Sequence, residues 1–185
     1  MRRNNSGFSM LELLIVIAII GIIAVMALPS AWNFVKGYRL HTDASAIASQ
    51  LNVTRFRATS QFTPYRLSVT AGTGTYSMDR MNNTYGSPAS EVSLGLSQGI
   101  SFLTACPVSA KPGNIPSSFT ASSTAVYFNT RGLPVVPVGT SGTPTNTNVF
   151  YLKNDNDLYD AVTVSLGGRI TVWNYNVATT TWIAR

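Results

Sequence analysis

An apolar run near the N terminus constrains this chain more than any other feature. From Leu13 to Leu28, 16 consecutive residues carry no polar side chain, and with the residues before them the apolar stretch is 21 residues long. A helix of about 20 apolar residues can cross a bilayer. Arg2 and Arg3 precede the run, and basic residues favour the cytoplasmic side of a membrane. The sequence therefore predicts a membrane-spanning helix over residues 8–29, with the rest of the chain outside the cytoplasm.

Glu12 is the one acidic residue within this apolar segment. A carboxylate at the centre of a membrane helix costs roughly 2.5–3.5 kcal/mol, and less near the helix end, so its presence needs a cationic partner. If the chain is cut after Gly7, the new α-amine of Phe8 is such a cation, in the same subunit or in a neighbour. The pattern thus connects Glu12 with the new N terminus.

Gly7-Phe8 followed by Glu12 and a long apolar helix resembles the type III signal of type IV prepilins and pseudopilins, and Pro29 stands at the kink position of that family. The resemblance implies that residues 1–7 are a leader peptide, removed by a prepilin peptidase between Gly7 and Phe8. It also implies N-methylation of Phe8 and a role for Glu12 in subunit assembly. The implied partners are other pilin or pseudopilin subunits, the inner-membrane assembly platform and membrane lipid.

Two other interpretations of the N terminus remain open. An ordinary secretory signal peptide has a basic start, a shorter apolar core and a small-residue cleavage site, and Val25-Met26-Ala27 fits such a site. A plain single-pass anchor is the second. The length of the apolar core and the presence of Glu12 favour the prepilin interpretation, which places the protein in the inner membrane before it enters a filament.

The helical period continues through residues 30–60. Apolar or small residues recur at spacings of three and four, with Arg55 as the exception, which predicts an amphipathic stripe packed beneath a domain: Leu40, Ala44, Ile47, Ala48, Leu51 and Ala58. Pro64 marks the expected helix end, and Gly21 and Pro29 are expected to kink the first half. His41 and the basic residues Lys36, Arg39, Arg55 and Arg57 are expected to be solvated, with contacts to neighbouring subunits as the alternative.

Beyond Pro64 the pattern changes to short β-branched or aromatic runs separated by Gly, Pro, Asn and Ser. The expected strands are Tyr65–Val69, Thr75–Arg80, Ile100–Ala105, Ala125–Asn129, Val149–Lys153, Ala161–Leu166 and Arg169–Tyr175, with a hairpin at Gly167-Gly168 and loops over 82–99, 107–124 and 137–148. The expected fold is α+β. A long N-terminal helix packs on a C-terminal antiparallel domain of two sheets, and residues 30–185 form an extracytoplasmic pilin-like domain.

Three blocks narrow the resemblance to GspH/FimT-type minor pilins. They are Thr54–Ala58 with Tyr65-Arg66-Leu67, then Phe128–Pro134 with its Arg131-Gly132 pair, and Val162–Ile170 ending in Gly168-Arg169. The C-terminal cysteine pair common in major pilins is missing, since Cys106 is the only cysteine. The resemblance therefore favours a low-abundance priming or tip subunit.

The chain has few of the residue types that support catalysis or bind a cofactor. One histidine, one cysteine and seven acidic residues provide no metal or nucleophile constellation, and no phosphate-binding glycine loop occurs. The acidic segment 154–160 could ligate calcium through oxygen atoms, but it lacks the glycine and distal glutamate of an EF-hand and is better interpreted as a polar turn. Cys106 is best interpreted as a small buried residue.

The sequence therefore predicts no enzyme and no cofactor. It predicts a structural subunit of a type IV pilus or a type II secretion pseudopilus. One alternative is a DNA-binding minor pilin, because some FimT-like pilins bind DNA through a Gly-Arg-x-Arg motif. Here Gly168-Arg169 is followed by Ile170-Thr171, so Arg169 remains and the second arginine is lost. The other alternative is a simple membrane-anchored binding domain.

Overall fold

Helix α1 runs from Met10 to Ser60, 51 residues in the computed structural model. The structure describes residues 9–82, 85–86, 88–113, 121–138 and 141–185, and for residues 26–30 and 141 it describes the backbone alone. The chain separates into two units, Met1–Val35 and Lys36–Arg185. The helix therefore contributes its first half to one unit and its second half to the other, and each unit is described by itself.

The second half of α1 forms the spine of the larger unit. Leu40, Ala44, Ile47, Leu51 and Ala58 recur at helical spacing and are fully buried, as the amphipathic pattern predicts. The helix ends where the sequence stops supporting it. Phe62 has a positive φ of 50°, which lies outside the range of a right-handed helix. Pro64 disfavours helical backbone at Thr63, the residue directly before it.

The first sheet contains six antiparallel strands in the order β3-β2-β1-β5-β6-β7. Their bounds are β1 Tyr65–Thr70, β2 Thr75–Arg80, β3 Ala89–Gly95, β5 Ala125–Phe128, β6 Pro134–Val138 and β7 Ser141–Pro144. In β1, Leu67 lies opposite Met78 on one side and Val126 on the other, and all three pack in the core beneath α1. The opposite face is polar, where Arg66 Nε donates to Asp79 Oδ2 at 2.6 Å.

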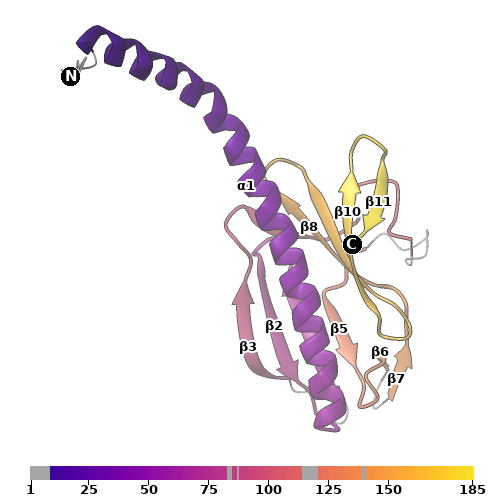
Figure 1. Cartoon of the computed structure of the whole chain (residues 1–185). Helices are drawn as coiled ribbons and strands as arrows, with labels where there is room; N and C mark the ends of the chain where they lie inside the picture. The colour runs from indigo at the N-terminus through magenta and orange to yellow at the C-terminus, as the bar shows by residue number, and fades with distance from the viewer. Residues whose placement is uncertain (1–8, 83–84, 87, 114–120, 139–140) are drawn as a thin grey trace, which may run out of the picture. The chain divides into compact units, whose positions relative to one another are not determined.

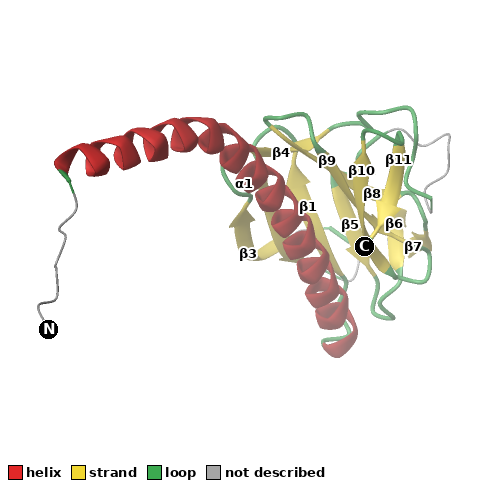
Figure 2. Ribbon diagram, turned by 45° about the horizontal axis from the view of Figure 1, so that its top comes forward, coloured by secondary structure: helices red, strands yellow, loops and turns green. Residues whose placement is uncertain are grey.

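The second sheet contains five antiparallel strands in the order β11-β10-β9-β8-β4. Their bounds are β4 Ile100–Leu103, β8 Asn148–Asn154, β9 Tyr159–Val164, β10 Ile170–Asn176 and β11 Thr181–Ala184. Figures 1 and 2 show the domain half of α1 lying across both sheets, and the shared core includes residues from each of them.

Sheet two is covered on both faces. Phe150 and Leu152 of β8 pack in the core beneath α1, whereas Val149 and Tyr151 belong to a separate cluster on the other face. That cluster includes Trp182, and the partly buried residues of the loop after β4 pack against it: Cys106, Val108 and Ala110. Cys106 is half-buried in this loop, and its thiol donates a hydrogen bond to the carbonyl of Val108 at 3.1 Å.

The predicted fold class is confirmed: a helix packs on two antiparallel sheets, and the Gly167-Gly168 hairpin joins β9 to β10. Four short strands were missed, and one of them is β6, since residues 134–138 were not expected to form a strand. Residues 82–99, expected to be a loop, contain β3, where Val92 is the only residue that is not exposed, so the strand has no apolar alternation to detect. Likewise β7 lies within the expected loop 137–148, and β11 had not been anticipated.

The expectation of a membrane-spanning first half is not confirmed. In the portion of the chain that the structure describes, no helix combines the length and the apolar character needed to cross a membrane. The backbone remains helical through Gly21 and Pro29, and the expected kink at these residues stays a prediction.

Candidate functional site

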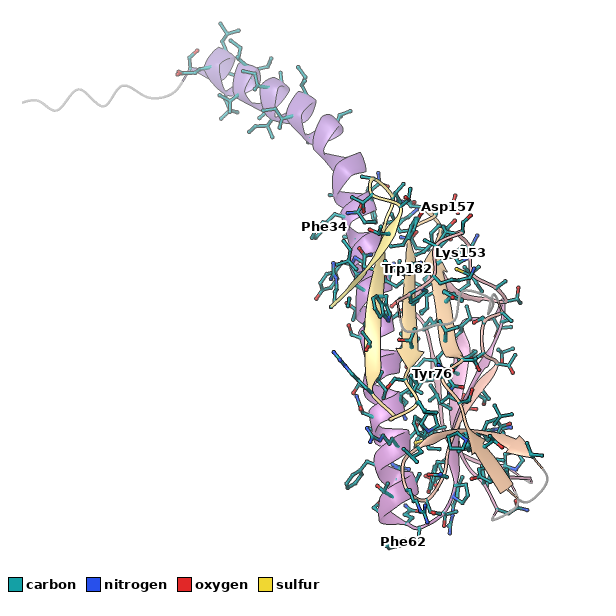
Figure 3. All side chains as sticks on the ribbon, turned by 90° about the vertical axis from the view of Figure 1, so that its right-hand side faces the viewer. Phe34, Phe62, Tyr76, Lys153, Asp157 and Trp182 are labelled. Atoms are coloured by element: carbon teal, nitrogen blue, oxygen red, sulfur yellow. The ribbon has the colours of Figure 1, made fainter. Side chains whose placement is uncertain are left out.

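The first unit presents an apolar helix surface without a partner inside it. From Leu13 to Val25, the large apolar side chains are between 45% and 71% exposed. Trp32 and Phe34 are also exposed, at 64% and 74%, and Figure 3 labels Phe34 on the helix. A contiguous exposed apolar surface marks a site of association with protein or lipid. This surface is therefore the strongest candidate for an assembly site.

Glu12 lies in the first turn of α1 and is exposed. Ser9 directly precedes the helix, and Glu12 follows it by three positions, which is the pattern of a capping box at a helix N terminus. The negative charge also suits the positive end of the helix dipole. Glu12 thus has a local structural role available besides the predicted role in assembly. Gly7 and Phe8, the predicted cleavage and methylation site, lie outside the described residues.

Around Gly21 the helix surface is open. A methyl group built at this glycine meets no atom within 4 Å among the described residues. The side chain of Pro29 lies outside the description, although its backbone is part of α1.

Arg55 belongs to the first of the three sequence blocks that resemble GspH/FimT-type pilins, and it lies against residues of the other two. Its guanidinium donates to the carbonyl oxygens of Gly168, at 3.0 Å, and Gly167, at 3.5 Å. A Cβ atom at Gly132 would lie 3.2 Å from Arg55 side-chain atoms. The second helix half, the β5–β6 turn and the β9–β10 turn therefore meet at one arginine. The expectation that Arg55 is solvated was wrong, because its guanidinium is hydrogen-bonded to the β9–β10 turn and its side chain packs close to Gly132.

Arg57 was also expected to be solvated, and it forms an ion pair with Glu91 of β3. The other carboxylate oxygen of Glu91 accepts the Tyr65 hydroxyl at 2.7 Å. Burial and the neighbouring Glu91 raise the pKa of the Tyr65 hydroxyl. The contact ties the edge strand β3 to the end of the helix, which explains why a strand with so little apolar pattern stays in the sheet.

His41 connects the helix to a buried carboxylate of the second sheet. Its Nδ1 lies 2.6 Å from Oδ2 of Asp160, a carboxylate that is 1% exposed, while Asn174 donates to the other oxygen at 2.9 Å. The expectation of a solvated histidine was therefore wrong. Burial raises the pKa of Asp160, although hydrogen bonds from Asn174 and His41 and the charge of Arg185 oppose that rise.

Replacing His41 by alanine is expected to lower the free energy of unfolding by about 1–3 kcal/mol near pH 8, since it leaves a buried carboxylate without its partner. Loss of His41 also raises the pKa of Asp160 further, because one opposing cause disappears. A carboxyl group whose pKa is higher in the folded state than in the unfolded state binds its proton more tightly when the protein is folded. Its protonation therefore stabilises the fold at pH values below its unfolded pKa of 3.8. This stabilisation is lost as the pH rises through the folded-state pKa. The penalty of the variant should therefore shrink toward pH 4, as measured by denaturant unfolding.

His41→Gln keeps a side-chain donor and serves as the matched control, with a smaller loss expected at pH 8. An equal loss at pH 4 and pH 8 for His41→Ala would show that His41 matters only for packing.

Arg169, the predicted DNA contact, follows the β9–β10 turn and lines a groove of 490 Å³. We call it the Arg169 groove, and its walls are Gly113, Ser165, Arg169, Thr171, Trp173 and Ala184. The orientation of the Trp173 ring is fixed by its neighbours. Its Nε1 donates to Thr163 at 2.8 Å, and Gly113 lies close to its six-membered ring. Trp182 is similarly held, since its Nε1 donates to the carbonyl of Ala110 at 2.9 Å.

The acidic segment between β8 and β9 is a turn stabilised by its own asparagine. Asn154 Oδ1 accepts from the backbone N–H groups of Asn156 and Leu158, at 3.0 and 2.9 Å. The Asp160 carboxylate points to His41 and Asn174 instead of into the turn. Within the described residues, no three acidic, histidine or cysteine side chains cluster in a way that could hold a metal ion.

Comparison with known proteins places a recognised motif at the N terminus. Residues 2–28 match the prokaryotic N-terminal methylation motif. The chain is also 42% identical over 65 residues to the type II secretion system protein H of Xanthomonas campestris pv. campestris. That alignment covers 35% of this chain and 38% of the relative's length, so the chain matches well under half of that protein.

Two solved structures resemble the model at low sequence identity. The minor pseudopilin EpsH from the type 2 secretion system of Vibrio cholerae is 10% identical, with a TM-score of 0.48 over 74% of this chain and 97% of EpsH. The type IV minor pilin FimU of Pseudomonas aeruginosa is 16% identical, with a TM-score of 0.48 over 74% of this chain and 90% of FimU. By its methylation motif and its similarity to protein H, the chain is similar to type IV pilin-like proteins and, over 65 residues, to a GspH-type subunit.

Proposed function

We propose that this protein is a minor pilin or pseudopilin that is built into a type IV pilus or a type II secretion pseudopilus. The observation that carries the proposal is the methylation motif over residues 2–28 running into a helix whose apolar side chains are exposed. Such a surface is costly in water and gains free energy when other subunits or lipid cover it. The protein's role in this proposal is structural, and its partners are other pilin-like subunits.

The maturation steps are part of the proposal. A prepilin peptidase cuts between Gly7 and Phe8, the amine of Phe8 is methylated, and the precursor is held at the inner membrane until the assembly platform takes it up. Glu12 then pairs with the amine of Phe8 in a neighbouring subunit. The sequence supports this order, because the polar leader ends in a small residue where the apolar segment begins.

Mass spectrometry of the protein from its native membrane tests the proposed maturation. The expected N terminus is Phe8, carrying one added methyl group. Replacing Gly7 by leucine should leave the protein seven residues longer, because a bulky residue blocks the cleavage site. An N terminus at or near Ser30 would instead show that residues 1–29 are an ordinary signal peptide.

DNA uptake receives less support as a second function. Among the described residues, Arg169 is the only cation that lines its groove, and sequence-independent binding to nucleic acid gains affinity with each phosphate contact. The nearby tryptophans are held by hydrogen bonds, which limits their use as stacking platforms for bases.

A further inference from the structure

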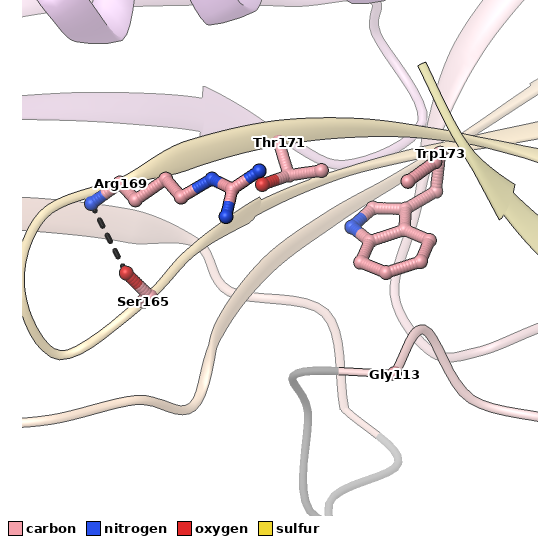
Figure 4. A pocket seen from close by; sticks show the side chains of 6 residues that line it. Gly113, Ser165, Arg169, Thr171 and Trp173 are labelled. Carbon is pink, nitrogen blue, oxygen red and sulfur yellow. Dashed lines mark hydrogen bonds between the residues drawn. The ribbon is translucent and has the colours of Figure 1, made fainter.

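Three of the side chains that line the Arg169 groove lie at alternate positions along β10 and the residue just before it. Arg169 directly precedes β10, and Thr171 and Trp173 follow it at alternate positions, so the three side chains share one face of the sheet. Figure 4 shows the Arg169 side chain extending along the strand to Thr171, with Trp173 beyond it. A cation, a hydroxyl and an aromatic ring therefore follow one another over about 13 Å, at about 3.3 Å per residue.

The position of Arg169 is fixed by its turn. Its backbone N–H donates to Ser165 Oγ at 3.0 Å, and the Ser165 N–H donates to the carbonyl of Arg169 at 2.9 Å. On the opposite side, Arg55 holds the carbonyl oxygens of Gly167 and Gly168. The base of the Arg169 side chain is therefore held by contacts that would exist without any ligand, which lowers the cost of ordering it on binding.

The charge of Arg169 is not neutralised within the described part of the domain, where its guanidinium has no ion pair or hydrogen bond. Acidic residues of the domain are engaged elsewhere: Asp79 with Arg66, Glu91 with Arg57, and Asp160 with His41. The groove thus presents one unpaired guanidinium, two hydroxyls from Ser165 and Thr171, and an apolar wall.

One guanidinium suits one carboxylate, which it can bind through two parallel hydrogen bonds. A nucleic acid strand offers a phosphate at every nucleotide and favours several cations, whereas Arg169 is the one cation among the described residues that line this groove. A peptide in extended conformation matches the geometry better, since its alternate side chains repeat at the same spacing as those of β10. We infer that the Arg169 groove binds an extended acidic peptide segment of a protein partner, with a carboxylate on Arg169 and an apolar side chain against Trp173.

In a filament this partner would be another subunit, and to that extent the inference rests on the proposed function. The binding test itself does not depend on filament assembly, so the two can fail separately.

The test uses the full-length protein in detergent micelles, labelled with ¹⁵N for NMR. The probe is a short capped peptide of serine and threonine with one glutamate four positions from one leucine. We expect it to shift the indole N–H signal of Trp173 and the amide signals of Arg169 and Thr171. Arg169→Gln should weaken binding roughly tenfold or more, as expected for loss of a charge-assisted hydrogen bond. Arg131→Gln, which removes an exposed arginine outside the groove, should leave the affinity unchanged.

Three results would overturn the inference. The first is equal binding of a peptide with glutamine in place of glutamate. The second is unchanged affinity of the Arg169→Gln protein for the glutamate peptide. The third is a single-stranded oligonucleotide that shifts these signals while the peptide does not, which would assign the groove to nucleic acid. Failure to assemble with normal peptide binding would count against the proposed function alone.

Discussion

Cells that carry Glu12→Leu are expected to process and accumulate the protein but to contain none of it in sheared filaments. Two unit charges about 4 Å apart interact by roughly 4 kcal/mol at an effective dielectric of 20, and desolvation offsets only part of that. Leucine removes the charge that we propose pairs with the amine of Phe8 in a neighbour. Immunoblots of membrane and filament fractions measure the outcome, with the wild-type protein as the reference.

Glu12→Gln is the matched control because Ser9 and Glu12 also fit a capping box, in which glutamine can replace glutamate. If capping were the only role, Glu12→Gln would assemble like wild type. We expect it to assemble less, because it keeps a hydrogen bond and loses the charge. Normal assembly of Glu12→Leu would refute a role of Glu12 in assembly and shift support to a simple anchored domain.

Replacing Gly168 by alanine is expected to destabilise the domain by about 2–4 kcal/mol. Gly168 has a φ of +79°, where a side chain is strained. Its new methyl group would also lie 2.9 Å from the carbonyl oxygen of Gly132 and 3.0 Å from the guanidinium carbon of Arg55. The variant must therefore separate the two turns that meet at Arg55. Chemical denaturation followed by tryptophan fluorescence measures the loss.

The neighbouring Gly167 provides the control, because a methyl group there meets nothing within 4 Å among the described residues. Gly167→Ala should change the free energy of unfolding by no more than about 0.5 kcal/mol. Equal losses in the two variants would mean that the tight approach of Gly168 to Gly132 and Arg55 does not stabilise the fold.

Periodicity predicted the elements that bury one regular face. The stripe from Leu40 to Ala58 gave the helix, and alternation in Val162 and Val164 gave a strand of sheet two. Strands that bury little escaped prediction. β11 places only Trp182 inward. β3 places only Val92 against the core, and the contacts of Glu91 with Arg57 and Tyr65 add to its attachment.

The contacts of His41 and Arg55 with the second sheet could not be predicted from spacing, because their partners are more than 100 positions away in the sequence. One signal was available. Asp160 stands at the start of an apolar strand, and a carboxylate in such a place needs a partner. The chain has a single histidine, His41, next to the buried Leu40 on the amphipathic helix, which makes it a natural candidate. The apolar N-terminal segment, in contrast, was evident from the sequence.

The contacts of Arg55 and His41 also bear on the order in which the chain can fold. Arg55 and Gly168 are 113 positions apart, and His41 and Asp160 are 119 apart. Synthesis delivers the N terminus first, so the helix exists well before the strands that cover its inner face. Contacts between residues so distant in sequence also form slowly. The apolar residues of both helix halves are therefore uncovered together during synthesis, and a newly made chain depends on a membrane or a carrier to keep it from aggregating until its last strands arrive.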